Sequence, residues 1–146
     1  MRAFAIAVSL AVLGVLGIRS PAGADTKTYS AALSAAEETP TPGPAGGTGN
    51  ATITIDLAAK TLCYDVTWSQ AVGTPSAGHI HRGPKGLNGP IVVVFDLPAK
   101  PKACLQVDST VLGQIASDPG GHYVNIHADK YPGGAVRGQL KEGSSS

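Results

Sequence analysis

Charged side chains are scarce in this sequence: Asp, Glu, Lys and Arg make up 14% of its 146 residues, and the 11 basic and 10 acidic residues nearly balance. A near-neutral chain with scattered lysines lacks the concentrated positive charge that nucleic acid or an anionic membrane attracts. Aromatic residues are also few, at 5%, whereas glycine is abundant with 19 residues. This composition favours a loop-rich β-sheet protein over a helical fold, and neither nucleic acid nor a membrane is expected as a partner of the mature chain.

Familiar catalytic patterns are also absent from the sequence. No serine lies in a Gly-x-Ser-x-Gly turn, and the adjacent Glu37 and Glu38 would point to opposite sides of an extended strand. Residues 83–90 are rich in glycine and proline, but they lack the Gly-Lys-Ser/Thr ending of a phosphate-binding loop and precede a strand. We therefore predict no catalytic residues and a protein that is not an enzyme.

The N-terminus has the pattern of a secretory signal. Arg2 supplies positive charge, residues 3–18 are almost entirely apolar, and small residues precede an expected cleavage after Ala24. Cleavage there removes Arg2 and Arg19, which leaves 9 basic and 10 acidic residues, a net charge of −1. The sequence predicts a signal peptide at 1–24, one domain at 25–141, a disordered tail at 142–146, and a secreted or periplasmic location.

The two cysteines, Cys63 and Cys104, agree with an exported protein. An even number of cysteines in an oxidising compartment usually means a disulfide. Two thiolate metal ligands are the alternative, but neither cysteine lies near a histidine in the sequence. We expect a Cys63–Cys104 bridge that straps the loop at 98–102 across the outside of the sheet.

Alternation of apolar and polar residues predicts strands along most of the mature chain. Residues 51–57 alternate strictly, and Leu62, Tyr64, Val66 and Trp68 form one apolar face that should pack with part of the run at 91–97, which we expect as a central strand. A helix of a turn or two is expected within 108–117. The predicted fold class is all-β: a Greek-key β-sandwich, immunoglobulin-like or superoxide-dismutase-like, of about seven or eight strands with at most one short helix. The other expected strands lie at 26–33, 122–128 and 135–140.

Histidines stand out in two apolar stretches. On a strand, His79 and His81 share one face, and Asn125 and His127 repeat that spacing, so three imidazoles could converge between two sheets. One interpretation is a polar network in which the three histidines hydrogen-bond to the backbone and to Asn125 or Arg137 and so join the sheet edges. The other is a metal site for copper or zinc with His79, His81 and His127 as ligands. His122 is the less favoured fourth imidazole, because its odd offset from His127 places it on the opposite face.

The same stretches carry a family resemblance. The run HIHRGP at 79–84, followed by LNGPIVV at 87–93, resembles the central signature of the CHRD (chordin) domain. YVNIH at 123–127 and YPGGAVRGQL at 131–140 resemble its C-terminal signature, and residues 29–38 resemble its opening strand. The resemblance implies a single-domain secreted module that binds an undefined extracellular or periplasmic partner or has a structural role, without catalysis. Adhesion through exposed strand edges is a further alternative.

A weaker similarity concerns the histidines alone. A His-x-His strand that meets a histidine from a later strand is similar to the copper side of Cu,Zn superoxide dismutase, where an arginine guides the anion, a place that Arg137 could take here. The long zinc-binding loop of that family is missing. The alternative function is therefore an extracytoplasmic copper or zinc protein, redox-active if the metal is copper.

Overall fold

The computed structural model describes residues 26–143, and within them nine strands form one antiparallel sheet. The strands are β1 (Thr26–Ser34), β2 (Thr48–Asp56), β3 (Thr61–Trp68), β4 (Pro75–Arg82), β5 (Ile91–Phe95), β6 (Lys102–Gln106), β7 (His122–Ala128), β8 (Tyr131–Gln139) and β9 (Lys141–Glu142). One α-helix, α1 (Ser109–Ser117), and the 3₁₀ segments η1 (Ala35–Glu37), η2 (Gln70–Val72) and η3 (Pro119–Gly121) complete the described part. The predicted all-β fold with one short helix is confirmed.

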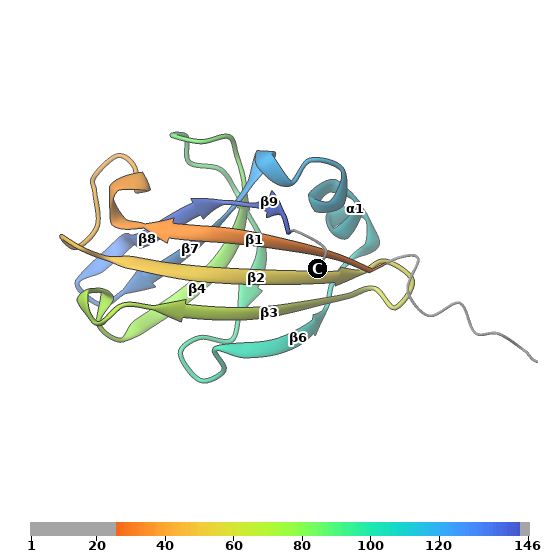
Figure 1. Ribbon diagram of the computed structural model, residues 1–146, viewed down its shortest axis with the longest axis horizontal. Coiled ribbons are helices and arrows are strands. Elements are labelled where there is room, and N and C mark those ends of the chain that lie inside the picture. Colours follow the sequence, from red (N-terminus) through yellow and green to blue (C-terminus); the bar gives the residue numbers. More distant parts are fainter. Residues whose placement is uncertain (1–25, 144–146) are drawn as a thin grey trace, which may run out of the picture.

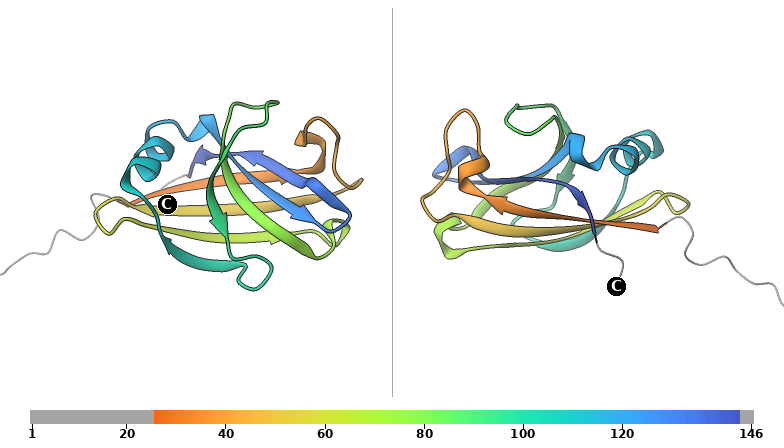
Figure 2. Two further views of the ribbon diagram at one scale, coloured as in Figure 1. Left: turned by 180° about the vertical axis from the view of Figure 1, so that it is seen from behind. Right: turned by 45° about the horizontal axis from the view of Figure 1, so that its top comes forward.

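The sheet curls until its two halves face each other. The strand order is β5-β4-β7-β8-β1-β2-β3-β6, with β9 attached to β1. In Figures 1 and 2 the layer of β1, β2 and β3 lies over the layer of β4, β7 and β8. The halves are joined where β1 meets β8, through the single pair Ser34 and Arg137. The two layers of the predicted sandwich are thus parts of one continuous sheet.

The hydrophobic core fills the space between the layers. Alternate residues of each strand contribute to one buried cluster, among them Ile53 and Leu62 from one half and Ile80, Val124 and Ile126 from the other. Tyr64 on β3 stacks on Phe95 of β5, with ring centroids 4.2 Å apart. This contact brings β5, at one end of the strand order, against β3, the last strand but one at the other end. The two halves of the sheet thereby close around the core.

The helix α1 covers one end of this core, as the sequence predicts. The side chain of Asp108 accepts a hydrogen bond from the N–H of Thr110 and so caps the first turn. Leu112 and Ile115, on the inner face of the helix, are fully buried. The capping residue and the buried face therefore account for the short helix within an otherwise β-sheet protein.

The disulfide forms as predicted, but its surroundings differ from the prediction. Cys63 and Cys104 are bonded, with Cα atoms 3.9 Å apart. They are directly opposite each other in the β3–β6 ladder, because the chain after the 98–102 loop continues as β6. The bridge therefore joins two neighbouring strands and does not strap a loop across the sheet.

Three further expectations need correction. The run at 91–97 is not a central strand: β5 ends at Phe95 and lies at an edge of the sheet, with Ile91 and Val94 exposed. Trp68, expected in the core, is only partly buried at the end of β3. The expected tail at 142–146 begins too early, because Glu142 pairs with Tyr29 and the N–H of Gly143 bonds Thr28.

The expected signal peptide at 1–24 lies outside the described residues. Between residues 26 and 143, no helix has both the length and the apolar character needed to cross a bilayer.

Candidate metal centre

The three histidines lie on the outer face of the β4–β7 pair, not between the layers. In the antiparallel register His79 is opposite Asn125, and Ala77 is opposite His127, so these side chains share one face. Ile80 lies between the two β4 histidines, is opposite Val124, and belongs to the core cluster on the other face. The sequence thus predicts correctly that the histidines share a face. The expectation that this face points between two sheets is wrong.

The fold brings all three imidazoles together. Their candidate ligand atoms lie within 4.8 Å of one another. The ring of His79 stands edge-on to the rings of His81 and His127, at centroid distances of 5.5 and 5.0 Å. Around a shared ion bound at about 2.0–2.1 Å, ligand nitrogens lie roughly 3.3–4.2 Å apart. The candidate ligand atoms are thus separated by distances only slightly larger than those between three ligands of one ion.

Backbone carbonyls fix which nitrogen of two histidines carries the proton. His81 Nδ1 lies 2.9 Å from the carbonyl oxygen of Gly89, and His127 Nδ1 lies 2.8 Å from that of Pro132. A carbonyl oxygen only accepts, so each Nδ1 donates and each Nε2 keeps a free lone pair in the neutral ring. This is the arrangement that metal-bound histidines usually have.

The remaining nitrogens of the cluster have no hydrogen-bond partner among the described residues. His79 Nδ1, His81 Nε2 and His127 Nε2 are all buried from solvent and unpaired. An unpaired buried polar atom costs roughly 1–3 kcal/mol. Each of the three neighbouring imidazoles thus has one buried nitrogen without a protein partner among the described residues.

Burial also disfavours the charged forms of two of the three imidazoles. Removal from water, and then the neighbouring His127 and His81 rings, lower the pKa of His79 to about 4. The pKa of His81 is lowered as well, mainly by burial. Neutral imidazole is the form that binds a metal ion. His79 and His81 therefore offer lone pairs, and not positive charge, at neutral pH.

A loop at 83–90, between β4 and β5, covers part of the site, and Arg137 of β8 holds it in place. Arg137 is 1% exposed. Its guanidinium donates to the carbonyls of Pro84 and Leu87, at 3.1 and 2.8 Å, and to the side chain of Asn88. Its Cζ also lies 3.5 Å from the centre of the Tyr123 ring. Arg137 is fully engaged within the protein, so it does not present a cation that guides an anion to the site.

Asn125 contacts a carboxyl group instead of a histidine. Its Nδ2 donates to Glu38, which follows η1, and to the carbonyl of Val136. Glu38 is 7% exposed, and burial raises the pKa of its carboxyl group to about 7 although Arg137 and Asn125 oppose the shift. Of the expected polar network, the hydrogen bonds to the backbone form at His81 and His127, whereas the partners of Asn125 and Arg137 among the described residues include none of the three histidines. Both residues instead fix the segments around the site.

His122 stands apart from the cluster, as its spacing predicts. Its Nδ1 bonds the carbonyl of Asp118 at 2.8 Å, and its Nε2 is buried and unpaired. It is opposite Arg82 at the end of β7, on the opposite face from Tyr123 and His127. A single unpaired imidazole is no metal site. His122 is therefore a matched control for the other three.

Sequence reasoning missed Tyr123, Gly89 and Glu38. Tyr123 is two residues before Asn125, so strand alternation was enough to place it on the histidine face, where it stacks on His81. Gly89 and Glu38 come from loops, and only the folded structure brings them to the site.

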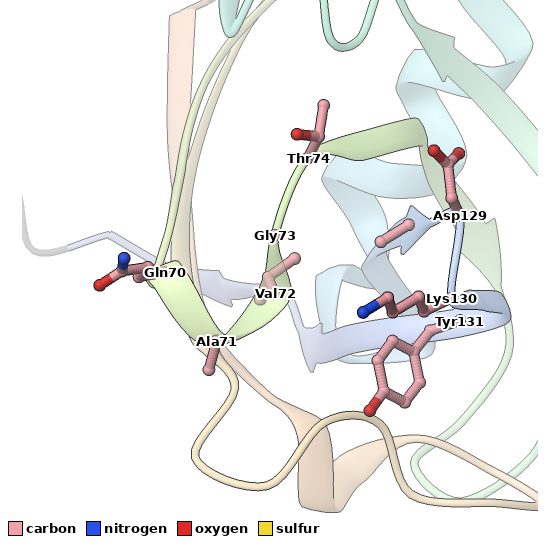
Figure 3. A pocket seen from close by; sticks show the side chains of 9 residues that line it. Gln70, Ala71, Val72, Gly73, Thr74, Asp129, Lys130 and Tyr131 are labelled. Atoms are coloured by element: carbon pink, nitrogen blue, oxygen red, sulfur yellow. The ribbon is translucent and has the colours of Figure 1, made fainter.

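A pocket near this region has a different character. It lies between η2 and the turn from β7 to β8 and is drawn in Figure 3. Lys130 and Tyr131 line one side, and residues 70–74 line the other. None of its lining residues is a histidine or a cysteine, so it adds no ligand to the imidazole cluster.

The family model of the CHRD domain matches residues 29–140, nearly all of the described chain. The chain belongs to the CHRD family. No curated protein and no solved structure matches it. The match confirms the family predicted from the two signatures, and the CHRD domain suggests a binding or structural module. The disulfide and the family agree with an extracellular location. The likeness to superoxide dismutase remains a prediction.

Proposed function

We propose that this CHRD domain is an extracytoplasmic, non-catalytic metal-binding module with His79, His81 and His127 as its protein ligands. Two observations carry the proposal: candidate ligand nitrogens of the three histidines lie within 4.8 Å of one another, and each of these imidazoles has a buried nitrogen without a hydrogen-bond partner among the described residues. The carbonyls of Gly89 and Pro132 orient two of the rings in the metal-binding tautomer. Structural networks of histidines pair these nitrogens, and here they are left free.

The donor set favours copper or zinc. Imidazole suits both ions, and three histidines leave at least one coordination position for water or another ligand. The described part of the chain places no carboxylate or thiolate within the cluster, so the ion's charge is not neutralised by the protein. Either metal would link β4 and β7 across the ladder that already joins them.

The broader expectation of an extracellular protein partner stands beside this proposal. The family match supports a binding or structural role. Ile91 and Val94 of β5 are exposed, at 49% and 61%, and are directly opposite His81 and His79. These apolar side chains border the metal ligands on the open edge of the sheet, so a partner that covers this edge would also cover the site.

Metal titration of the mature, oxidised protein tests the proposal. Calorimetry with Cu(II) and Zn(II) should give about one equivalent, and His79→Gln, His81→Gln and His127→Gln should each abolish tight binding. His122→Gln is the control, because that histidine has the same carbonyl contact and the same unpaired nitrogen outside the cluster. A wild-type protein that binds neither ion, or binding that only His122→Gln removes, would refute the site.

A further inference from the structure

We propose that Arg137 is a positioning residue of the metal site, which acts through the 83–90 loop to orient His81. This inference rests on the proposed metal-binding function. Arg137 is the most deeply buried charged residue described, at 1% exposure, and it touches none of the three ligands through a hydrogen bond. Any effect of Arg137 on the ligands must therefore act through the segments that it contacts.

The guanidinium fixes the loop by three contacts, two to backbone carbonyls and one to a side chain. It donates to the carbonyls of Pro84 and Leu87 and to Oδ1 of Asn88. The planar guanidinium holds its donors in a fixed geometry that matches several separate acceptors, whereas the ammonium of lysine is a compact charge on a flexible stem. Asn88 in turn donates to the carbonyl of Thr39, so the 83–90 loop is tied to the segment that follows Glu38. The next residue in the loop is Gly89, whose carbonyl orients His81.

Gly89 has little freedom to move once the loop is fixed. A Cβ atom at this position would lie 1.7 Å from the carbonyl oxygen of Arg82, so the loop backbone packs directly on β4. The N–H of Gly89 donates to the hydroxyl of Tyr123, at 3.2 Å. The two polar groups of one glycine thus contact His81 and Tyr123, which are opposite each other on β4 and β7.

A second route leads from Arg137 to His81 through Tyr123. The guanidinium lies over the Tyr123 ring, and that ring stacks on His81 with centroids 4.8 Å apart and planes 4° apart. Through the loop and through the stack, Arg137 holds His81 in the orientation that places its Nδ1 against the Gly89 carbonyl and leaves its lone pair on Nε2.

The test compares Arg137→Gln with Arg137→Lys and with the control Arg82→Gln, which removes an exposed arginine beside His81. Cu(II) affinity should fall about 10- to 100-fold in Arg137→Gln, as for lost partners of metal ligands. It should fall less in Arg137→Lys and stay within about twofold in Arg82→Gln. The imidazole ¹⁵N shifts of the metal-free protein give a second readout. His81 should become a mixture of tautomers in Arg137→Gln, while His127, held by Pro132, should not change.

The two readouts separate the two proposals. Unchanged Cu(II) affinity together with an unchanged His81 tautomer in Arg137→Gln would overturn the positioning role. A wild-type protein that binds no Cu(II) would overturn the metal function, and the tautomer comparison would still decide whether Arg137 orients His81. If Arg137→Gln does not fold, Asn88→Ala replaces it. That variant removes one loop acceptor of Arg137 and the contact that ties the loop to Thr39, so an unchanged His81 tautomer there would overturn the proposal.

Discussion

The buried carboxyl group of Glu38 should make the stability of this protein depend on pH near neutrality. Glu38 is 7% exposed, accepts a hydrogen bond from Asn125, and has a pKa raised from 4.5 to about 7, chiefly by burial. In the unfolded chain the carboxyl group ionises near its ordinary pKa. Stabilisation by the protonated group is therefore complete below about pH 4.5 and is lost as the pH rises through 7.

The size of the effect follows from that shift. A difference from 4.5 to about 7 corresponds to about 3 kcal/mol without any screening, and partial access of solvent reduces this to about 2 kcal/mol. Glu38→Gln keeps the shape of the protonated group and cannot ionise. The variant should therefore gain about 2 kcal/mol relative to the wild type between pH 5 and pH 8.

Urea unfolding at several pH values measures this gain. The difference between wild type and Glu38→Gln is the quantity to follow, because the lowered pKa of His79 acts in the opposite direction and cancels in the difference. Glu37→Gln is the control, since it removes a more exposed carboxylate from the same segment. A difference that does not change with pH for Glu38→Gln would show that this carboxyl group ionises normally, and the reasoning from burial would fail.

Three further predictions concern the fold. Replacing both Cys63 and Cys104 by Ser should lower the unfolding free energy by up to about 4 kcal/mol, the chain-entropy value for a sequence separation of 41, without changing Cu(II) affinity. Lost Cu(II) binding would show that the bridge shapes the site. In urea unfolding, Trp68→Ala should lower the unfolding free energy by about 1–3 kcal/mol and Tyr64→Ala by about 3–5 kcal/mol, because Trp68 is only partly buried. Equal costs would contradict this burial. Val93→Ala should destabilise by about 1 kcal/mol or more, whereas Val94→Ala should stay within about 0.5 kcal/mol, since Val94 is 61% exposed. A reversed order would place the wrong face of β5 in the core.

Local patterns were enough to predict most of the elements. Strict alternation at 62–68 matches β3 within a residue, the alternation at 51–57 lies on β2 although that strand begins three residues earlier, and Asp108 caps α1 as expected. Which distant strands pair with each other could not be predicted from these patterns. The apolar run at 91–97 predicted a central strand, yet Ile91 and Val94 are exposed at an edge. Continuous apolarity cannot distinguish these positions, because the neighbours of a strand are set by the whole topology.

The clustering of the three histidines could be predicted from the sequence, but the contacts that hold them in place could not. Spacing by two predicts that His79 and His81 share a face, and the same spacing of Asn125 and His127 predicts that a third imidazole could converge with them. The apolar residues between the ligands, Ile80 and Ile126, were the available signal that the core lies on the other face. The contacts of Arg137 with the 83–90 loop span about fifty residues of sequence, and no local pattern encodes them.

Placement on the outer face separates metal binding from folding. The core between the layers is complete without the imidazoles, because Ile80, Val124 and Ile126 fill the inner face of the same strands. Replacing a ligand histidine therefore opens no cavity in the core. His81 and His127 each give up one hydrogen bond to a carbonyl, whereas His79 has no partner at Nδ1 to lose. A polar network that served stability would be most sensitive where its hydrogen bonds are, at His81 and His127. A metal site is sensitive at all three, so His79 is the residue at which the two interpretations differ most.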